Sequence, residues 1–144
     1  MNKQKSPIPQ GFYRPTTRHG NTVYTAGMTP RQDGVLVFSG KINHNISVTA
    51  YRDAVRLATA NALQATLDIV SENEQIDKVL TLTVYIATDE KFQLHSKIAD
   101  FASEYLHEQL GEAGIGARAA VGVFSLPGGA PVEVQLTVAI TSHQ

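Results

Sequence analysis

A strictly alternating segment near the end of the chain places the strongest constraint on the fold. From Val132 to Ile140 every second residue is apolar, and the residues between them are Glu, Gln, Thr and Ala. Because successive side chains of a β-strand point to opposite faces of a sheet, this pattern predicts a strand with one core face and one less apolar face. Residues 76–88 repeat the pattern, with apolar positions at Leu80, Leu82, Val84 and Ile86.

The segment 48–70 has the periodicity of an amphipathic helix. Its apolar residues recur at offsets of three and four, and Ser47 or Thr49 can cap its N-terminus. The apolar face is largely alanine, which lets the helix lie close against a sheet; it comprises Val55, Ala58, Ala62, Ala65 and Ile69. Asn61 lies beside this face, and we interpret it as a buried asparagine bonded to backbone rather than as a catalytic residue.

A second helix is predicted over residues 90–110. Asp89 can cap its start, and Gly111 and Gly114 end it, because glycine readily adopts the left-handed conformation that follows a helix. The stripe expected to face the core is Leu94, Ile98, Phe101, Tyr105, Leu106 and Leu110.

The N-terminal part is expected to contain an irregular arm and a hairpin. The first twenty residues hold three of the six prolines and show no apolar period, so residues 1–11 are predicted to be irregular. Residues 21–27 and 35–38 are rich in β-forming residues and are predicted to be strands. Asp33 and Gly34 suit a left-handed turn between them, and we therefore expect these two strands to pair.

Two further strands, at 117–124 and 132–140, complete the chain. The order ββαβαββ predicts one α+β domain over residues 1–144, with both helices on one face of a mixed sheet. The other face would carry few charges, at Thr81, Thr83, Tyr85, Glu133, Gln135, Thr137 and Ala139. Such a face suggests burial against another subunit, and a solvated antiparallel face is the alternative.

The composition narrows the possible chemistry. The 144-residue chain has no cysteine, which excludes a thiol nucleophile, a disulfide framework and cysteine-ligated zinc. Its net charge of −1 does not favour nucleic-acid binding through phosphate neutralisation. The five histidines form no metal-binding pattern and no Gly-rich nucleotide loop follows a strand, so we expect neither a metal nor a cofactor. The polar N-terminus and the lack of a long apolar run predict a cytoplasmic protein with no membrane partner.

Arg118 and Glu133 are the candidate functional residues of the last two strands. Arg118 is flanked by small residues, which leaves room for a carboxylate that its planar guanidinium can bind bidentately. A surface arginine, or an ion pair with Glu133, is the alternative. Glu133 can hold a water or relay a proton, and an exposed strand glutamate is its alternative. Since a short link makes the two strands run in opposite directions, we expect these residues to lie roughly 20 Å apart and to share a site only across a subunit boundary.

Several motifs resemble a known family. Residues 116–135, from Gly-Ala-Arg-Ala-Ala-Val to Pro-Val-Glu-Val-Gln, are similar to the signature of the RidA/YjgF family, also called the L-PSP endoribonuclease family. Residues 20–27 resemble its N-terminal signature, and residues 58–63 and 111–114 resemble a less-studied branch. The resemblance covers residues 10–140, nearly the whole chain.

The resemblance implies a chorismate-mutase-like fold and a homotrimer whose sheets form a central barrel, with ligand sites in clefts between subunits. It also implies that the strand around 80–86 separates the last two strands, where a hairpin at Gly128 and Gly129 would otherwise be expected. Well-characterised members hydrolyse reactive enamines and imines such as 2-aminoacrylate, which releases ammonia and a 2-keto acid.

The resemblance also assigns roles to individual residues. Arg118 matches the arginine that binds the substrate carboxylate, Glu133 matches the glutamate that positions water, and Tyr13 matches the tyrosine that lines the pocket. Gly27, which ends the N-terminal signature, is expected to contact substrate as well.

Two positions depart from the family pattern. Ala120 stands where the best-known members have cysteine, so a thiol cannot be essential here. The family's asparagine on the second helix falls at Asp100. Both positions are expected to border the substrate, and a carboxylate near Arg118 would compete for it or repel an acidic ligand.

The leading functional hypothesis is a trimeric imine/enamine deaminase, a hydrolase acting on 2-aminoacrylate-type intermediates. The alternative is a non-catalytic trimer that binds a small carboxylate metabolite, with Asp100 and Ala120 marking lost catalysis. An endoribonuclease is least favoured, because the chain lacks a basic stretch interleaved with aromatic residues.

Overall fold

A five-stranded sheet in the order β1–β2–β7–β5–β6 forms the centre of the computed structural model, which describes residues 4–143. Its strands are β1 (Thr16–His19), β2 (Thr22–Thr25), β5 (Glu74–Ala87), β6 (Ala117–Val123) and β7 (Val132–Ser142). β5 pairs antiparallel with β7 and parallel with β6. The last two strands therefore lie on either side of β5, as the family resemblance implies.

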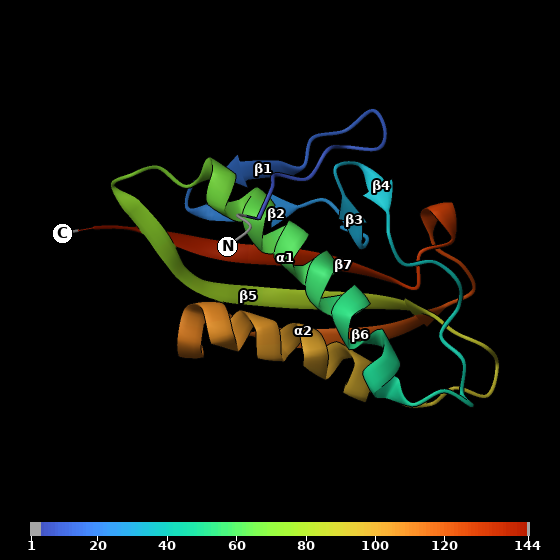
Figure 1. Ribbon diagram of the computed structural model, residues 1–144. Helices are drawn as coiled ribbons and strands as arrows, with labels where there is room; N and C mark the ends of the chain where they lie inside the picture. The colour runs from blue at the N-terminus through green and yellow to red at the C-terminus, as the bar shows by residue number, and fades with distance from the viewer. Residues whose placement is uncertain (1–3, 144) are drawn as a thin grey trace.

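Two helices, α1 (Arg52–Ile69) and α2 (His95–Leu110), cover one face of this sheet (Figure 1). α1 contacts α2 and β7, and α2 also contacts β5 and β6. The predicted core face of β7 is buried throughout, at Val132, Val134, Leu136, Val138 and Ile140. The alanines of α1 allow this close approach, since Ala58 and Ala62 have no exposed surface. The predicted α+β fold and the order ββαβαββ are confirmed for this sheet.

The first hairpin differs from the prediction. β2 pairs with β1 and β7, whereas the predicted strand 35–38 contributes to a separate two-stranded ribbon of β3 (Arg31–Gln32) and β4 (Val35–Leu36). The predicted turn is present within this ribbon, where Asp33 has φ 53° and Gly34 has φ 80°. β1 escaped prediction because its sequence, Thr-Thr-Arg-His, contains no apolar residue that could reveal an alternation.

Neither helix begins with its predicted cap. A 3-10 turn (Val48–Tyr51) precedes α1, and Ser47 makes no capping hydrogen bond; its hydroxyl instead lies 2.9 Å from that of Thr49. α2 begins at His95, later than predicted. Leu94 therefore precedes the helix and is 47% exposed rather than part of the core.

Irregular pairing at the start of β5 changes which residues face the core. The register with β7 shifts between Ile76 and Lys78 and again between Val79 and Thr81. Because one extra residue reverses the faces of a strand, Val79 is buried in place of the predicted Leu80. Beyond the second shift, the predicted alternation holds.

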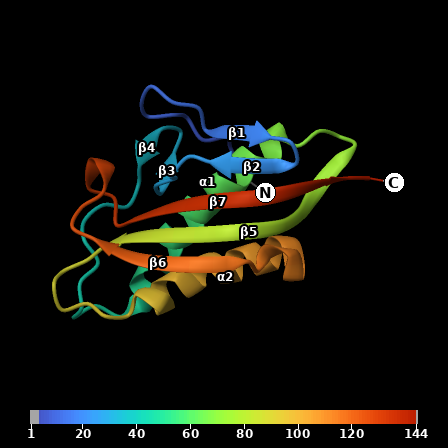
Figure 2. The same ribbon diagram turned by 180° about the vertical axis from the view of Figure 1, so that it is seen from behind.

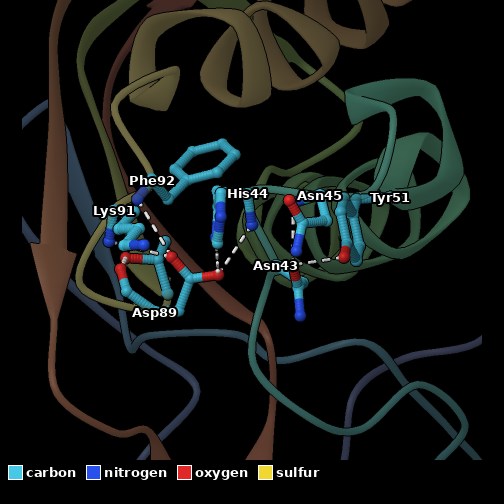
Figure 3. A network of polar contacts seen from close by, with 8 residues as sticks. Asn43, His44, Asn45, Tyr51, Asp89, Lys91 and Phe92 are labelled. Carbon is cyan, nitrogen blue, oxygen red and sulfur yellow. Dashed lines mark hydrogen bonds and ion pairs between the residues drawn. The ribbon is translucent and has the colours of Figure 1, made fainter.

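Asp89 joins two loops instead of capping α2 (Figure 3). Its Oδ2 accepts a hydrogen bond from the backbone N–H of His44 at 2.7 Å and lies 2.8 Å from His44 Nδ1. Its Oδ1 accepts hydrogen bonds from the backbone N–H groups of Lys91 and Phe92, each at 3.0 Å. These contacts favour the ionised carboxylate, and they lower the pKa of Asp89 to about 2, with the backbone N–H of His44 as the largest cause.

We expect the stability of the protein to fall as pH decreases from about 5 to about 2. The folded-state pKa of Asp89 lies below the unfolded value, so its contribution is present above the unfolded pKa and is lost as pH falls through the folded one. Glu74, whose pKa is lowered to about 2 chiefly by Arg18, adds to the same decline.

Urea unfolding across this pH range tests the expectation. Asp89→Asn should have a shallower acid decline than the wild type, whereas Asp77→Asn, which alters an exposed residue of β5, should follow the wild type. Identical acid declines for Asp89→Asn and the wild type would contradict it.

Candidate active site

Arg118 lies on the helix side of the edge strand β6, beneath α2. Its Nη1 donates hydrogen bonds to Asp100 Oδ1 (2.8 Å) and Ser103 Oγ (3.1 Å). Its Nη2 donates to the hydroxyl (2.8 Å) and the carbonyl oxygen (3.3 Å) of Ser96. Ser96, Asp100 and Ser103 are spaced by four and three residues, so one face of α2 holds the guanidinium. Within residues 4–143, Nε of Arg118 has no hydrogen-bond partner.

Asp100 balances the charge of Arg118. The predicted alternative, in which Arg118 pairs with Glu133, is wrong, because its carboxylate partner is Asp100. The Asp100 side chain is 56% exposed and that of Arg118 is 22% exposed, so solvent reaches the pair. An ion pair this accessible contributes on the order of 1 kcal/mol or less, so a ligand carboxylate can compete for the guanidinium.

Ala120 and Gly122 continue the row of helix-side positions that begins at Arg118. Ala120 packs against the hydrophobic core. Gly122 leaves space for His95, because a Cβ at this glycine would lie 2.6 Å from His95 Nε2. The His95 ring also meets Phe92 edge-to-face, with centroids 5.3 Å apart. The imidazole of His95, at the start of α2, therefore lies over this row at Gly122.

His95, Ser96 and Ser103 were not predicted as site residues. The spacing of Ser96, Asp100 and Ser103 indicates a shared helical face and could have been noticed. Nothing in that spacing indicates that this face overhangs β6, because the packing angle between a helix and a sheet is a tertiary property.

Glu133 lies on the other face of the sheet, the one that Figure 2 presents with the helices behind it. It is paired across strands with Tyr85 of β5. A Cβ added at Gly27 would overlap Oε2 of Glu133, so the absence of a side chain at Gly27 makes room for this carboxylate. Glu133 is half-buried, and this burial raises the pKa of its carboxyl.

The pairing register shows how Arg118 and Glu133 are related. Arg118 is level with Leu82 and Glu133 with Tyr85, which are three residues apart on β5 and so roughly 10 Å apart along it. The predicted 20 Å is too long, because Arg118 and Glu133 each lie one residue inside the start of their strand, which leaves three residues of β5 between their levels. The two side chains nevertheless lie on opposite faces of the sheet. One chain therefore does not bring Arg118 and Glu133 into one site.

Tyr13 and Gly27 line a cavity of about 820 Å³ between the N-terminal arm, the β3–β4 ribbon and α1. The hydroxyl of Tyr13 accepts a hydrogen bond from the backbone N–H of Gln10 at 3.0 Å. Residues 4–11 of the arm have no regular structure, as predicted, and residues 1–3 lie outside the described part. Gly27 thus lines this cavity and lies against Glu133. Arg118 does not line the cavity and does not contact Glu133.

Asn61 also lines this cavity and has the predicted structural role. It is 4% exposed, and its Nδ2 donates to the backbone carbonyl oxygens of Thr29 (3.1 Å) and Arg31 (2.9 Å). Its Oδ1 accepts a hydrogen bond from Nε2 of Gln4 at 2.8 Å. These contacts hold the β3–β4 ribbon and the arm against α1.

The sheet face opposite the helices has little charge at its centre. The residues facing outward from β2, β5, β6 and β7 there include Tyr24, Thr81, Thr83, Tyr85, Ala117, Ala119, Val121, Glu133, Gln135, Thr137 and Ala139. Glu133 is the one carboxylic acid of this set. Tyr24 is 47% exposed and Val121 is 37% exposed.

Metal-binding clusters and membrane-spanning helices are both absent from the part of the chain that the structure describes. Residues 4–143 contain no group of three or more His, Cys, Asp or Glu side chains that could hold a metal ion. In the same range, no helix combines the length and apolarity needed to cross a membrane.

Known proteins resemble this chain in sequence and in structure. Residues 5–135 match the family model described as "YjgF/chorismate mutase-like, putative endoribonuclease". Atu1372 of Agrobacterium tumefaciens, a solved protein of unknown function, is 31% identical with a TM-score of 0.80, over 93% of this chain and 86% of that one. Protein TCP17 of Trypanosoma cruzi is 27% identical over 85% of this chain and 78% of its own length.

E. coli TdcF, solved with bound serine, shares the fold, with a TM-score of 0.68 and 20% identity over 96% of this chain and 95% of its own. The family model covers most of the chain, from residue 5 to residue 135. The protein therefore belongs to the YjgF/chorismate mutase-like family and has that family's fold.

Proposed function

We propose that the protein hydrolyses small enamine and imine acids of the 2-aminoacrylate type to 2-keto acids and ammonia. The observation that carries this proposal is the environment of Glu133. Its carboxyl group is half-buried, has a raised pKa and lies against a glycine. A carboxyl group in such surroundings is suited to proton transfer, because its pKa moves toward neutral pH.

The active site is proposed to form between subunits of a homotrimer. Arg118 and Glu133 lie on opposite faces of one sheet. They can share a site only if Arg118 of one subunit approaches Glu133 of a neighbouring subunit. The centre of the outer sheet face supports such an assembly, because most of its side chains are apolar or neutral and gain from burial. Sedimentation equilibrium measures the mass directly, and a monomer at micromolar concentration would contradict this arrangement.

The proposed reaction has two steps. The methylene carbon of 2-aminoacrylate gains a proton, which produces the iminium acid. Water then adds to the iminium carbon and the carbon–nitrogen bond breaks, so that the iminium zwitterion and water become the keto-acid anion and ammonium. Arg118 would hold the carboxylate. Glu133 would accept a proton from the attacking water and return it to the leaving nitrogen, which regenerates the carboxylate of Glu133. Since free imines already hydrolyse in water, orientation and proton transfer meet a modest catalytic demand.

A coupled assay tests the activity. We expect the protein to accelerate keto-acid release when it is added to a PLP-dependent threonine or serine dehydratase. Arg118→Ala should reduce this acceleration at least about tenfold, since charge-assisted hydrogen bonds contribute roughly 1.5–3 kcal/mol. Arg52→Ala, at the exposed start of α1, is the matched control and should retain activity. No acceleration by the wild type, or equal acceleration by Arg118→Ala, would refute the proposal.

The ion pair between Arg118 and Asp100 favours a second candidate, a non-catalytic protein that binds a small carboxylate metabolite. The bound serine of TdcF, a protein of the same fold, makes amino acids reasonable ligands to test. Calorimetric binding of serine or 2-ketobutyrate without acceleration in the coupled assay would favour this candidate. Cleavage of single-stranded RNA that is lost in Arg118→Ala would instead favour the ribonuclease activity named in the family description.

A further inference from the structure

We infer that Asp100 makes the Arg118 site selective for zwitterions, in which a cationic nitrogen lies next to the carboxylate, over simple carboxylates. The inference deepens the proposed function and rests on it in one respect, namely that a ligand carboxylate binds at Arg118. It makes Asp100 a specificity-determining residue of the site.

The occupied state of the guanidinium is the first observation behind this inference. The hydrogen bonds from Nη1 and Nη2 of Arg118 go to Asp100, Ser96 and Ser103. A simple carboxylate must therefore displace Asp100 or bind beside it. Displacement leaves Asp100 without its charge partner, and binding beside it places two negative groups near one positive group. Either route weakens the binding of a monoanion.

The unused atoms of the pair are the second observation. Nε of Arg118 and Oδ2 of Asp100 have no hydrogen-bond partner among residues 4–143. Both side chains are open to solvent, at 22% and 56% exposure. A zwitterion can place its carboxylate near Arg118 and its ammonium or iminium nitrogen near Asp100, so that each charge meets its opposite. The hydroxyls of Ser96 and Ser103 already bind the guanidinium and need not be displaced.

This selectivity would also affect the proposed reaction. The iminium acid that water attacks is a zwitterion, whereas the keto-acid product is a simple anion. Asp100 would therefore favour the reactive protonated imine over the product and would assist product release. The role is one of positioning, because Asp100 itself exchanges no proton or bond with the substrate in this scheme.

Two ligands that differ only at the α substituent test the inference. L-Serine carries an ammonium group where L-glycerate carries a hydroxyl, and the remaining atoms correspond. By titration calorimetry, we expect the wild type to bind serine about tenfold more tightly than glycerate. Asp100→Asn should reverse the preference. The ammonium group of serine loses its anionic partner, and the net charge of the Arg118–residue 100 pair changes from zero to +1. Serine should weaken and glycerate should tighten, each by about tenfold.

Two variants serve as controls. Asp77→Asn makes the same charge change at an exposed position of β5 and should leave both affinities unchanged. Arg118→Lys should weaken both ligands, because lysine lacks the planar guanidinium. Thermal melts of each variant show whether α2 still packs on β6.

The outcomes separate this inference from the proposed function. Asp100→Asn that leaves the preference unchanged, or a wild type that binds neither ligand, would overturn the inference. A reversed preference without keto-acid release would support the inference and refute the deaminase. Turnover in the coupled assay with no effect of Asp100→Asn on the preference would support the deaminase and refute the inference.

Discussion

Gly116→Ala is expected to lower the melting temperature by about 10 °C. A Cβ at Gly116 would overlap the carbonyl oxygen of Val79, and would lie 2.9 Å from the carbonyl carbon of Val79 and 3.0 Å from the carbonyl oxygen of Leu80. These are backbone atoms of β5, which cannot rotate away as a side chain can. The start of β6 would have to move from β5, at a cost of about 3 kcal/mol in the free energy of unfolding. For a chain of this size, each kcal/mol corresponds to roughly 3 °C.

Gly20→Ala separates this steric effect from a general intolerance of alanine. Gly20 has φ 59°, and no atom lies within 4 Å of the position that an added methyl group would occupy, so only backbone strain of about 1 kcal/mol is expected. Calorimetric melts of the two variants should therefore differ by several degrees. Equal melting temperatures would show that β6 adapts to the methyl group. Because Gly116 is two residues before Arg118, the variant should also lower activity in the coupled assay.

Glu133→Gln is expected to reduce the acceleration of keto-acid release at least about 100-fold, the usual minimum for loss of a general acid or base. The same substitution should maintain or increase the stability of the folded protein. Burial raises the pKa of Glu133, so folding disfavours the ionised form and the wild type loses stability as pH rises above the unfolded pKa. The neutral amide of glutamine removes this cost. The variant should therefore melt at the same or a higher temperature than the wild type at neutral pH.

A pH profile strengthens this test. The wild-type activity should titrate with an apparent pKa above the usual glutamate value of about 4.3, and this transition should be absent from Glu133→Gln. Glu72→Gln, an exposed residue before β5, is the control for loss of one carboxylate. An inactive Glu133→Gln that also melts at a lower temperature would indicate a structural role instead.

Sequence periodicity was sufficient for the parts of the fold in which one face is fully buried. β7, the second half of β5 and the two helices were predicted because apolar residues must recur at the period of the element that buries them. β1 could not be predicted because its sequence of Thr, Arg and His has no apolar alternation. This edge strand is held in the sheet by its backbone hydrogen bonds to β2. The residue type of Asp89 suits a helix cap, yet its two carboxylate oxygens accept hydrogen bonds from backbone N–H groups of two different loops.

The candidate site was predictable in its residues but not in its arrangement. Arg118 and Glu133 stand out by their residue type among small and apolar neighbours, and the family motifs add Gly27 and Tyr13. Motifs carry no information on which face of a sheet a residue occupies once bulges and pairing register are set. The opposite placement of Arg118 and Glu133 emerged only when the register of β5 with both neighbours was known.

The alternating strands, the two amphipathic helices and the residues of the family motifs were predictable from the amino-acid sequence alone. These depend on local periodicity and residue type, which are properties of neighbouring positions. Three arrangements became apparent only in the folded chain: Asp100 and two serines hold Arg118, Gly27 makes room for Glu133, and Asp89 joins two loops. Each of these contacts joins separate elements, and packing geometry rather than spacing along the chain brings them together.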